Sequence, residues 1–210
     1  MDELDYYDER AEMLSYVPSD AKRVLDVGCG TGLFGSALRK RGCYVAGIEP
    51  WAEPARAARQ RLDEVYVDTV ENVFSTLPEA HYDCMVFNDV LEHLVDPWKI
   101  LQVAKERLTL GGSVVASIPN VRHYRVVKEL LVSGAWSYQD YGVLDRTHLR
   151  FFTKTSMLEL FESAGFTVQR QEGIRPARIP RKFGVFVKLI SKRPEELTFE
   201  RYALVGRPRT

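Results

Sequence analysis

The segment Val24–Gly32 constrains the fold of this chain more than any other. Val24–Val27 is a short apolar strand interrupted by a single acid, Asp26, and glycines follow at three alternate positions, Gly28, Gly30 and Gly32. A helical pattern begins directly afterwards at Leu33. A strand, a glycine-rich turn and a helix in succession let the backbone approach a ligand closely. We therefore expect an α/β fold with a ligand at this turn.

Strand and helix patterns alternate through the first half of the chain. Apolar runs typical of strands lie at 23–27, 44–48, 65–67, 82–87 and 112–118, and helical patterns lie at 33–41, 52–61, 70–76 and 97–108. Such alternation is typical of strands that pair in parallel, with helices covering both faces of the sheet. The pattern predicts a doubly wound, mostly parallel sheet in one domain, 1–210.

The remaining segments flank this sheet. A lead-in helix is expected at 4–16, and the alternation stops after Pro119. The insert at about 120–152 is rich in aromatic, histidine and arginine residues, which is typical of a segment that covers a substrate site. A helix at 154–163 and two further strands, at 166–171 and 197–206, complete the expected elements.

Acidic residues beside the turn indicate which ligand it binds. Asp26 lies two residues before Gly28, where a carboxylate attracts an ammonium group and repels a pyrophosphate. Glu49 closes the second strand, from where an acid can bind ribose hydroxyls, and Asp68 follows the third, where it can accept from an adenine amino group. Each acid can instead cap a helix. The glycines alone also fit a dinucleotide site, so a nicotinamide-dependent dehydrogenase is an alternative.

Charge and cysteine content argue against several other classes. The chain has 29 basic and 29 acidic residues, so no general attraction for nucleic acid is indicated. Its 3 cysteines lack the spacing of a zinc site. No segment is long and apolar enough to span a bilayer, and the acidic start does not resemble a secretion signal, so we expect a cytoplasmic protein.

One basic segment departs from this balance. Arg175–Arg193 contains seven lysines and arginines and no acid, and it encloses the apolar run Phe183–Ile190. The run could rest on an anionic membrane surface if it is helical. We favour a buried helix before the last strand.

These segments resemble the class I S-adenosylmethionine-dependent methyltransferases. Asp26-x-Gly28-x-Gly30-x-Gly32 is similar to the family's first motif, and the segments Tyr82–Asn88 and Leu110–Val114 are similar to its fourth strand and to the turn into its fifth. The resemblance implies a Rossmann-like seven-stranded sheet with a reversed last strand. It also implies that S-adenosylmethionine, converted to S-adenosylhomocysteine, is bound by Asp26, Gly28, Cys29, Gly30, Gly32, Glu49, Pro50, Asp68, Thr69, Asn88 and Asp89.

Two histidines are candidates for catalysis. His148 lies among charged residues in a segment with neither a helical nor a strand pattern, and its imidazole titrates in the range useful for a general base. His93 belongs to Asp89-Val90-Leu91-Glu92-His93, which resembles the Glu-x-x-Glu-His metal pattern of some relatives, with Asp89 in place of the first glutamate. Asp89, Glu92 and His93 are therefore weak candidates for metal ligands, and we expect no metal; helix capping explains the two acids equally well.

The insert supplies the candidate acceptor-binding residues. Aromatic side chains stack on sugar rings and hydrogen-bond their hydroxyls, and arginines can hold the diphosphate of a nucleotide sugar or lipid-linked acceptor. Ion pairs with Asp140 or Asp145 are the structural alternative for the arginines. The candidates are His123, Tyr124, Trp136, Tyr141, Arg146 and Arg150.

Three functions are consistent with these features. Gly142–Thr153 resembles methyltransferases of bacterial cell-surface sugar clusters, which favours methylation of a hydroxyl on a sugar or sugar-bearing metabolite in polysaccharide biosynthesis. The Glu92-His93 pair indicates a quinone or other small aromatic acceptor as an alternative. A non-catalytic adenosylmethionine-binding partner in methionine biosynthesis is the third reading. The sequence indicates neither the acceptor nor the oligomeric state.

Overall fold

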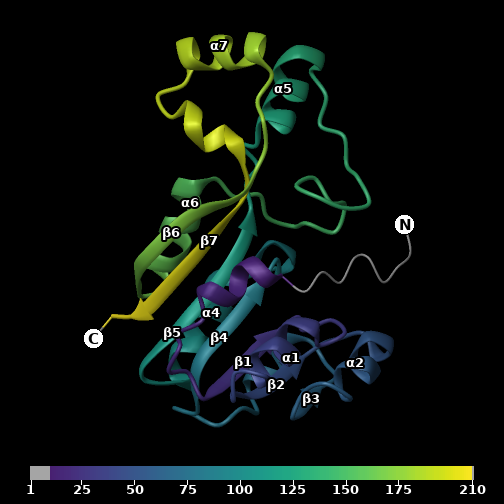
Figure 1. Ribbon diagram of the computed structural model, residues 1–210, viewed down its shortest axis with the longest axis vertical. Helices are drawn as coiled ribbons and strands as arrows, with labels where there is room; N and C mark the ends of the chain where they lie inside the picture. The colour runs from purple at the N-terminus through teal and green to yellow at the C-terminus, as the bar shows by residue number, and fades with distance from the viewer. Residues whose placement is uncertain (1–9, 210) are drawn as a thin grey trace.

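The computed structural model describes residues 10–209, which form a seven-stranded sheet covered by helices on both faces (Figure 1). The strand order is β3-β2-β1-β4-β5-β7-β6. The strands are β1 (Arg23–Val27), β2 (Tyr44–Ile48), β3 (Glu64–Tyr66), β4 (Tyr82–Asn88), β5 (Leu108–Pro119), β6 (Phe166–Pro176) and β7 (Phe199–Pro208). Strands β1 to β5 pair in parallel, and β7 runs antiparallel to both β5 and β6. The predicted doubly wound sheet with a reversed last strand is confirmed.

Two apolar cores lie on opposite faces of the sheet because strand side chains alternate between them. Leu25 and Val27 of β1 face one core, and Val24 faces the other. The first core is covered by α3 (Val70–Phe74), α4 (Pro97–Arg107) and α6 (Lys154–Ser163). The second is covered by α1 (Leu33–Arg39), α2 (Ala52–Ala58) and the 3-10 helix η2 (Ala11–Ser15).

The lead-in helix predicted at 4–16 is shorter and of a different type within the described residues. Residues 11–15 form the 3-10 helix η2, and residues 4–9 lie outside the described residues.

Helix α6 has the predicted bounds, and a capping box fixes its start. The Thr153 side chain accepts from the Ser156 backbone N–H, and the Ser156 hydroxyl accepts from the Thr153 backbone N–H.

A group of helices lies beyond the carboxyl ends of β4 and β5, and we call it the cap. It consists of α5 (Tyr124–Ser133), α7 (Arg181–Ile190) and the 3-10 helix η4 (Pro194–Thr198) (Figure 1). Phe183 and Val187 of α7 pack with Leu197 and against Tyr124 and Val127 of α5. The buried helix favoured from the sequence is therefore buried on its inner side only. Its other side is exposed because it faces away from α5 and the sheet.

Candidate active site

The glycine-rich turn follows β1 and lies against the start of the turn after β4. Gly28 has a φ of 68°, a conformation that side chains rarely adopt, and a Cβ added there would be 2.6 Å from Val90 Cγ2. The backbone N–H groups of Gly28 and Cys29 both donate to the Ile48 carbonyl oxygen, at 2.8 and 3.0 Å. The turn is therefore held between the ends of β2 and β4, where doubly wound sheets bind ligands.

Asp26 is the strongest electrostatic feature at this turn. Its side chain lies on the face covered by α1 and is buried, and its Oδ2 atom has no hydrogen-bond partner among residues 10–209. Burial, with a smaller contribution from the nearby Glu49 carboxylate, raises the pKa of Asp26 to about 7. An unpartnered buried carboxylate beside a second one favours a cationic ligand group at this position.

Glu49, at the end of β2, is tied to the turn by backbone hydrogen bonds. Its Oε2 accepts from the Gly30 N–H at 2.9 Å and its Oε1 accepts from the Trp51 N–H at 3.0 Å. Burial raises the pKa of Glu49, and these two N–H donors oppose that rise. Each carboxylate oxygen has a second lone pair, so Glu49 can still accept from two hydroxyl groups.

The other predicted cofactor residues lie at the same edge of the sheet. Cys29 is buried, whereas Pro50 is exposed. Asp68 is exposed, and its Oδ1 accepts from the Thr69 N–H at 2.7 Å and from Asn72 Nδ2 at 2.9 Å, so it stabilises the start of α3. Both side-chain polar atoms of Asn88 are buried without a partner in the described chain, which leaves them available to a ligand.

Asp89, directly after β4, makes two ion pairs. It has a φ of 53°, and its Oδ2 accepts from Arg10 Nη2 at 2.6 Å and from Arg201 Nε at 2.7 Å. The Ser117 hydroxyl donates to its Oδ1 at 2.7 Å. These contacts outweigh desolvation and lower the pKa of Asp89.

Glu92, His93 and His148 converge beside this ion-pair cluster. Glu92 and His93 belong to the 3-10 helix η3 (Leu91–His93), and the backbone N–H groups of Leu149 and Arg150 donate to the Glu92 carbonyl oxygen at 2.9 and 3.0 Å. The two imidazole rings meet edge to face with centroids 4.7 Å apart. His148 Nε2 lies 3.9 Å from Glu92 Oε1, which is too long for a hydrogen bond.

Hydrogen bonding indicates the tautomer of each histidine. His148 Nδ1 lies 3.1 Å from the Val143 carbonyl oxygen, which can only accept, so Nδ1 carries the proton and Nε2 has a free lone pair. His93 Nδ1 lies 3.3 Å from the Thr147 carbonyl oxygen and 3.1 Å from the Thr147 hydroxyl, which donates its own proton to Asp145 Oδ1, so in the neutral ring Nδ1 carries the proton and Nε2 has a free lone pair. Burial and the neighbouring His93 lower the pKa of His148, which keeps it neutral near pH 7.

These three side chains have the composition of a divalent-metal site. One ligand atom from each lies within 4.8 Å of the others, and both carboxylate oxygens of Glu92 are buried without partners among the described residues. Two imidazoles and one carboxylate suit several divalent metals. Asp89, one of the three ligands considered from the sequence, is instead held by Arg10 and Arg201.

Aromatic side chains of the insert adjoin the histidines. Phe151 contacts His148, with ring centroids 6.2 Å apart, and Trp136 packs edge to face on Phe151 at 5.1 Å. Tyr141 is exposed, and Arg146 pairs with Asp140 at 2.7 Å, as the structural alternative for this arginine predicts. Arg150 Nη2 donates to the Val95 carbonyl oxygen at 2.6 Å.

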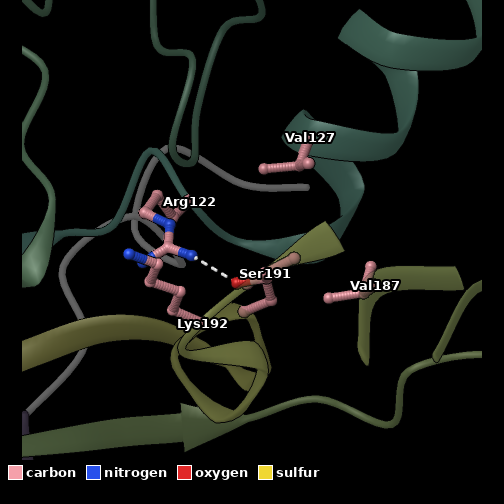
Figure 2. Close-up of a pocket in the computed structure, with 6 residues that line it drawn as sticks. Arg122, Val127, Val187, Ser191 and Lys192 are labelled. Carbon is pink, nitrogen blue, oxygen red and sulfur yellow. Dashed lines mark hydrogen bonds between the residues drawn. The ribbon is translucent and has the colours of Figure 1, made fainter. Parts of the chain in front are cut away.

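His123 and Tyr124 lie at the start of α5, at the base of the cap. A pocket of ≈ 290 Å³ opens nearby between α5 and α7 (Figure 2). It is lined by Arg122, Val127, Val187, Ser191, Lys192 and Leu197. Arg122 Nη2 donates to Ser191 Oγ across it at 3.0 Å. His123 is buried, and its Nε2 has no partner within the described part of the chain.

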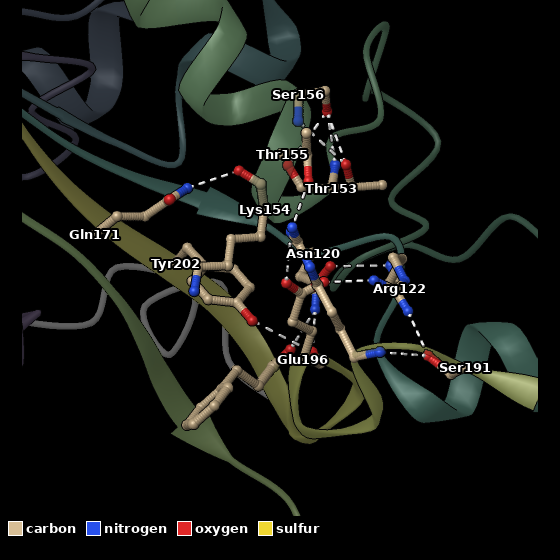
Figure 3. A network of polar contacts seen from close by, with 12 residues as sticks. Asn120, Arg122, Thr153, Lys154, Thr155, Ser156, Gln171, Ser191, Glu196 and Tyr202 are labelled. Carbon is tan, nitrogen blue, oxygen red and sulfur yellow. Dashed lines mark hydrogen bonds and ion pairs between the residues drawn. The ribbon is translucent and has the colours of Figure 1, made fainter. Parts of the chain in front are cut away.

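A polar network joins the cap to the sheet (Figure 3). Asn120, immediately after β5, donates through Nδ2 to the carbonyl oxygens of Glu196 and Phe199, both at 2.9 Å. Its Oδ1 accepts from the Arg122 N–H at 3.0 Å, and the Arg122 guanidinium pairs with the buried Glu196 carboxylate. These bonds fix η4 against the end of β5.

Comparison with known proteins identifies the family. The model of a methyltransferase domain matches residues 3–171. The chain belongs to this methyltransferase family. Among curated proteins, the ubiquinone biosynthesis O-methyltransferase of Aeromonas salmonicida is 28% identical over 168 residues, which is 77% of this chain and 70% of the relative. That of Pectobacterium atrosepticum is 35% identical over 122 residues, or 56% of this chain and 48% of the relative.

Solved methyltransferase structures share the fold. A SAM-dependent methyltransferase from Archaeoglobus fulgidus superposes with a TM-score of 0.72 at 17% identity, covering 98% of this chain and 99% of that one. One from Mesorhizobium loti gives a TM-score of 0.65 at 19% identity, covering 98% and 100%. The chain is an S-adenosylmethionine-dependent methyltransferase. The family match excludes a nicotinamide-dependent dehydrogenase, which agrees with the buried Asp26 carboxylate at the turn.

Two residues of this methyltransferase site were missed in the sequence. Arg201 is a buried charged residue within the apolar strand β7, a pattern that signals a buried partner. Arg10 carries no such signal, because it is one of several charged residues in the segment where the lead-in helix was expected. The proximity of Glu92 and His148, which stand 56 positions apart, also depends on the fold and not on local sequence.

Proposed function

We propose that this methyltransferase transfers the methyl group to a hydroxyl of a small aromatic acceptor of quinol or catechol type. The names of the curated relatives support an aromatic acceptor, and they do not mention the sugar favoured from the sequence. The observation that carries the proposal is the cluster of Glu92, His93 and His148, bordered by Phe151 and Trp136, at the carboxyl end of β4.

The residues around the glycine-rich turn fit the methyl donor. S-adenosylmethionine, when bound, supplies an electrophilic methyl group on a sulfonium. In the proposal Asp26 binds the ammonium group of its methionyl part, which matches the unpartnered buried Oδ2. Glu49 accepts from the ribose hydroxyls, Asp68 and Thr69 lie at the adenine end, and the Asn88 amide binds near the methionyl part.

The cluster supplies the proton acceptor. A phenolic hydroxyl has an ordinary pKa near 10, so it must lose its proton as the oxygen attacks the methyl carbon. The Nε2 lone pair of His148 is oriented by the bond from Nδ1–H to the Val143 carbonyl oxygen. Phe151 and Trp136 would stack on the acceptor ring and hold its oxygen in line.

A second route to deprotonation uses the same three side chains. The unpartnered Glu92 carboxylate and the two Nε2 lone pairs favour a bound divalent cation, which would lower the pKa of a coordinated hydroxyl. In that case His93 and His148 act as equivalent ligands, whereas in the first route His148 alone accepts the proton.

The acceptor class is tested by assaying the full chain against a catechol, a quinol and a sugar hydroxyl, with S-adenosylhomocysteine formation as the readout. Turnover of the aromatic acceptors with none on the sugar is expected. Turnover confined to the sugar would overturn the proposal.

The two routes are separated by His148→Gln, His93→Gln and chelation with EDTA. A large loss confined to His148→Gln, with no effect of EDTA, identifies His148 as the base. Equal losses in both variants, with EDTA inactivation reversed by Mg²⁺ or Zn²⁺, identify a cation site. S-adenosylhomocysteine affinity should stay unchanged throughout. His81→Gln, at the opposite end of β4, is the matched control.

A further inference from the structure

Helix α7 presents an apolar stripe to the outside of the molecule. Val185, Phe186 and Leu189 are 58%, 45% and 81% exposed, whereas Phe183 and Val187 on the opposite side are buried. Val185 and Leu189 stand four residues apart and therefore share one face of the helix. In Figure 1, α7 lies across the end of the molecule farthest from β3, with its outer face uncovered.

The end of α5 continues this apolar surface. Leu130, Leu131 and Val132, in its last turn, are 47%, 55% and 70% exposed. A pocket of ≈ 370 Å³ is lined by Val132 and Ser133 together with Pro180, the residue before α7. The two helices thus place six exposed, large apolar side chains at one end of the molecule. Apolar side chains grouped in this way indicate an interaction surface, whereas single exposed apolar residues are common on any protein.

Positive charges surround the stripe on α7. Arg178, Arg181, Lys182, Lys188 and Lys192 are exposed, and none forms an ion pair with an acid among residues 10–209. The sequence from 173 to 194 contains no acidic residue. Long basic side chains can keep their charges at the water interface while the apolar side chains between them enter a less polar phase.

From this arrangement we propose that the outer face of α7, with the end of α5, docks on an anionic phospholipid membrane surface. An amphipathic helix with apolar side chains between unpaired cations has the chemistry that anionic headgroups and acyl chains recognise. A second copy of this chain fits poorly, because a two-fold contact through α7 would bring the same cations together. No helix in the described residues is long and apolar enough to cross a membrane, so the contact is with one surface.

The proposal does not depend on which acceptor the enzyme methylates. Membrane docking and turnover are measured separately, so either can fail while the other stands. Docking would place the cap at the surface and the glycine-rich turn away from it.

The test is sedimentation of the full chain with phosphatidylcholine vesicles that contain or lack phosphatidylglycerol. Binding to the anionic vesicles is expected, with little binding to the neutral ones and loss of binding in about 1 M salt, where the screening length is about 3 Å. The proposal would be overturned if the chain does not bind to anionic vesicles, or if it binds equally well to anionic and neutral vesicles and equally well at low and high salt. These comparisons use the unmodified chain, so they do not depend on the folding of a variant.

Variants then locate the surface. Phe186→Ser with Leu189→Ser should weaken partitioning more than tenfold, because the apolar contact is lost. Lys182→Gln with Lys188→Gln should weaken it about fivefold per charge. Unchanged binding of both double variants would rule out α7.

Matched controls lie elsewhere on the surface. Leu110→Ser removes a side chain that is 99% exposed near the start of β5, and Lys40→Gln with Lys99→Gln removes two exposed charges, one directly after α1 and one on α4. Both should bind as the unmodified chain does. If the unmodified chain is instead a dimer in light scattering, and Phe186→Ser with Leu189→Ser makes it a monomer, a second copy covers this face and the membrane proposal fails.

Discussion

Replacing Asp26 with asparagine is expected to improve the stability of the cofactor-free enzyme and to weaken its cofactor binding. Burial raises the pKa of Asp26 from 3.8 to about 7. One pKa unit corresponds to about 1.4 kcal/mol, so the ionised form is disfavoured in the folded chain by about 4 kcal/mol. Asparagine keeps the shape of the side chain without the charge.

The sign of the pH dependence follows from this shift. Between pH 3.8 and about 7 the folded chain holds a proton that the unfolded chain has released. The contribution of Asp26 to the free energy of unfolding therefore falls as pH rises through this range and is lowest above it. The Asp26→Asn variant lacks this fall, so above pH 7 it should be more stable than the unmodified enzyme by up to about 4 kcal/mol.

Cofactor binding should change in the opposite direction. Losing the carboxylate that faces the ammonium group should weaken S-adenosylhomocysteine binding by about 2 to 4 kcal/mol, or about 30-fold to 1000-fold. In the unmodified enzyme the affinity should fall about tenfold for each pH unit below about 7, because the carboxyl group becomes protonated. The variant should show no such dependence.

Urea unfolding across this pH range and titration calorimetry with S-adenosylhomocysteine measure the two effects. Calorimetry in buffers of different ionisation enthalpy should also detect release of a proton on binding near pH 6. Asp20→Asn, at an exposed position, is the matched control. An Asp26→Asn variant that binds within about threefold of the unmodified enzyme would refute this reasoning.

Three further changes should alter stability, each measurable by urea unfolding. Gly28→Ala should lower the free energy of unfolding by about 1 to 2 kcal/mol, because alanine is strained in this left-handed backbone conformation, and contact of the new Cβ with Val90 should lower it further. An unchanged free energy of unfolding would contradict the described turn. Arg201→Met should lower the free energy of unfolding by about 3 kcal/mol, because it removes one partner of the largely buried Asp89 carboxylate. An unchanged midpoint of urea unfolding would show that this ion pair contributes little to stability. Asn120→Ala should lower the free energy of unfolding by about 3 kcal/mol, because it leaves the carbonyl oxygens of Glu196 and Phe199 and one N–H without their partner; Asn72→Ala, near the exposed start of α3, should lower it much less.

Much of the fold and of the cofactor end of the site follows from local sequence. Parallel buried strands are continuous apolar runs, so β1 and β2 were predicted with the bounds that the structure shows. Asp26 and Glu49 stand beside strand ends, and the carboxyl ends of parallel strands meet at one edge of the sheet, so their proximity could be predicted without coordinates.

The acceptor end of the site depends on contacts that local patterns do not encode. The insert has no regular period around His148, so nothing in the sequence shows that this side chain lies 3.9 Å from Glu92. The same holds for Arg10 and Arg201, which reach Asp89 from the two ends of the chain.

The sequence by itself determined the alternation of strands and helices, the glycine-rich turn and the acids beside it, because each depends on residues close together in the chain. The tertiary structure alone decided that Asp89 is held in ion pairs, that Glu92, His93 and His148 converge, and that the outer face of α7 is exposed. These features depend on which distant segments pack together, and packing is set by the whole core rather than by any one segment.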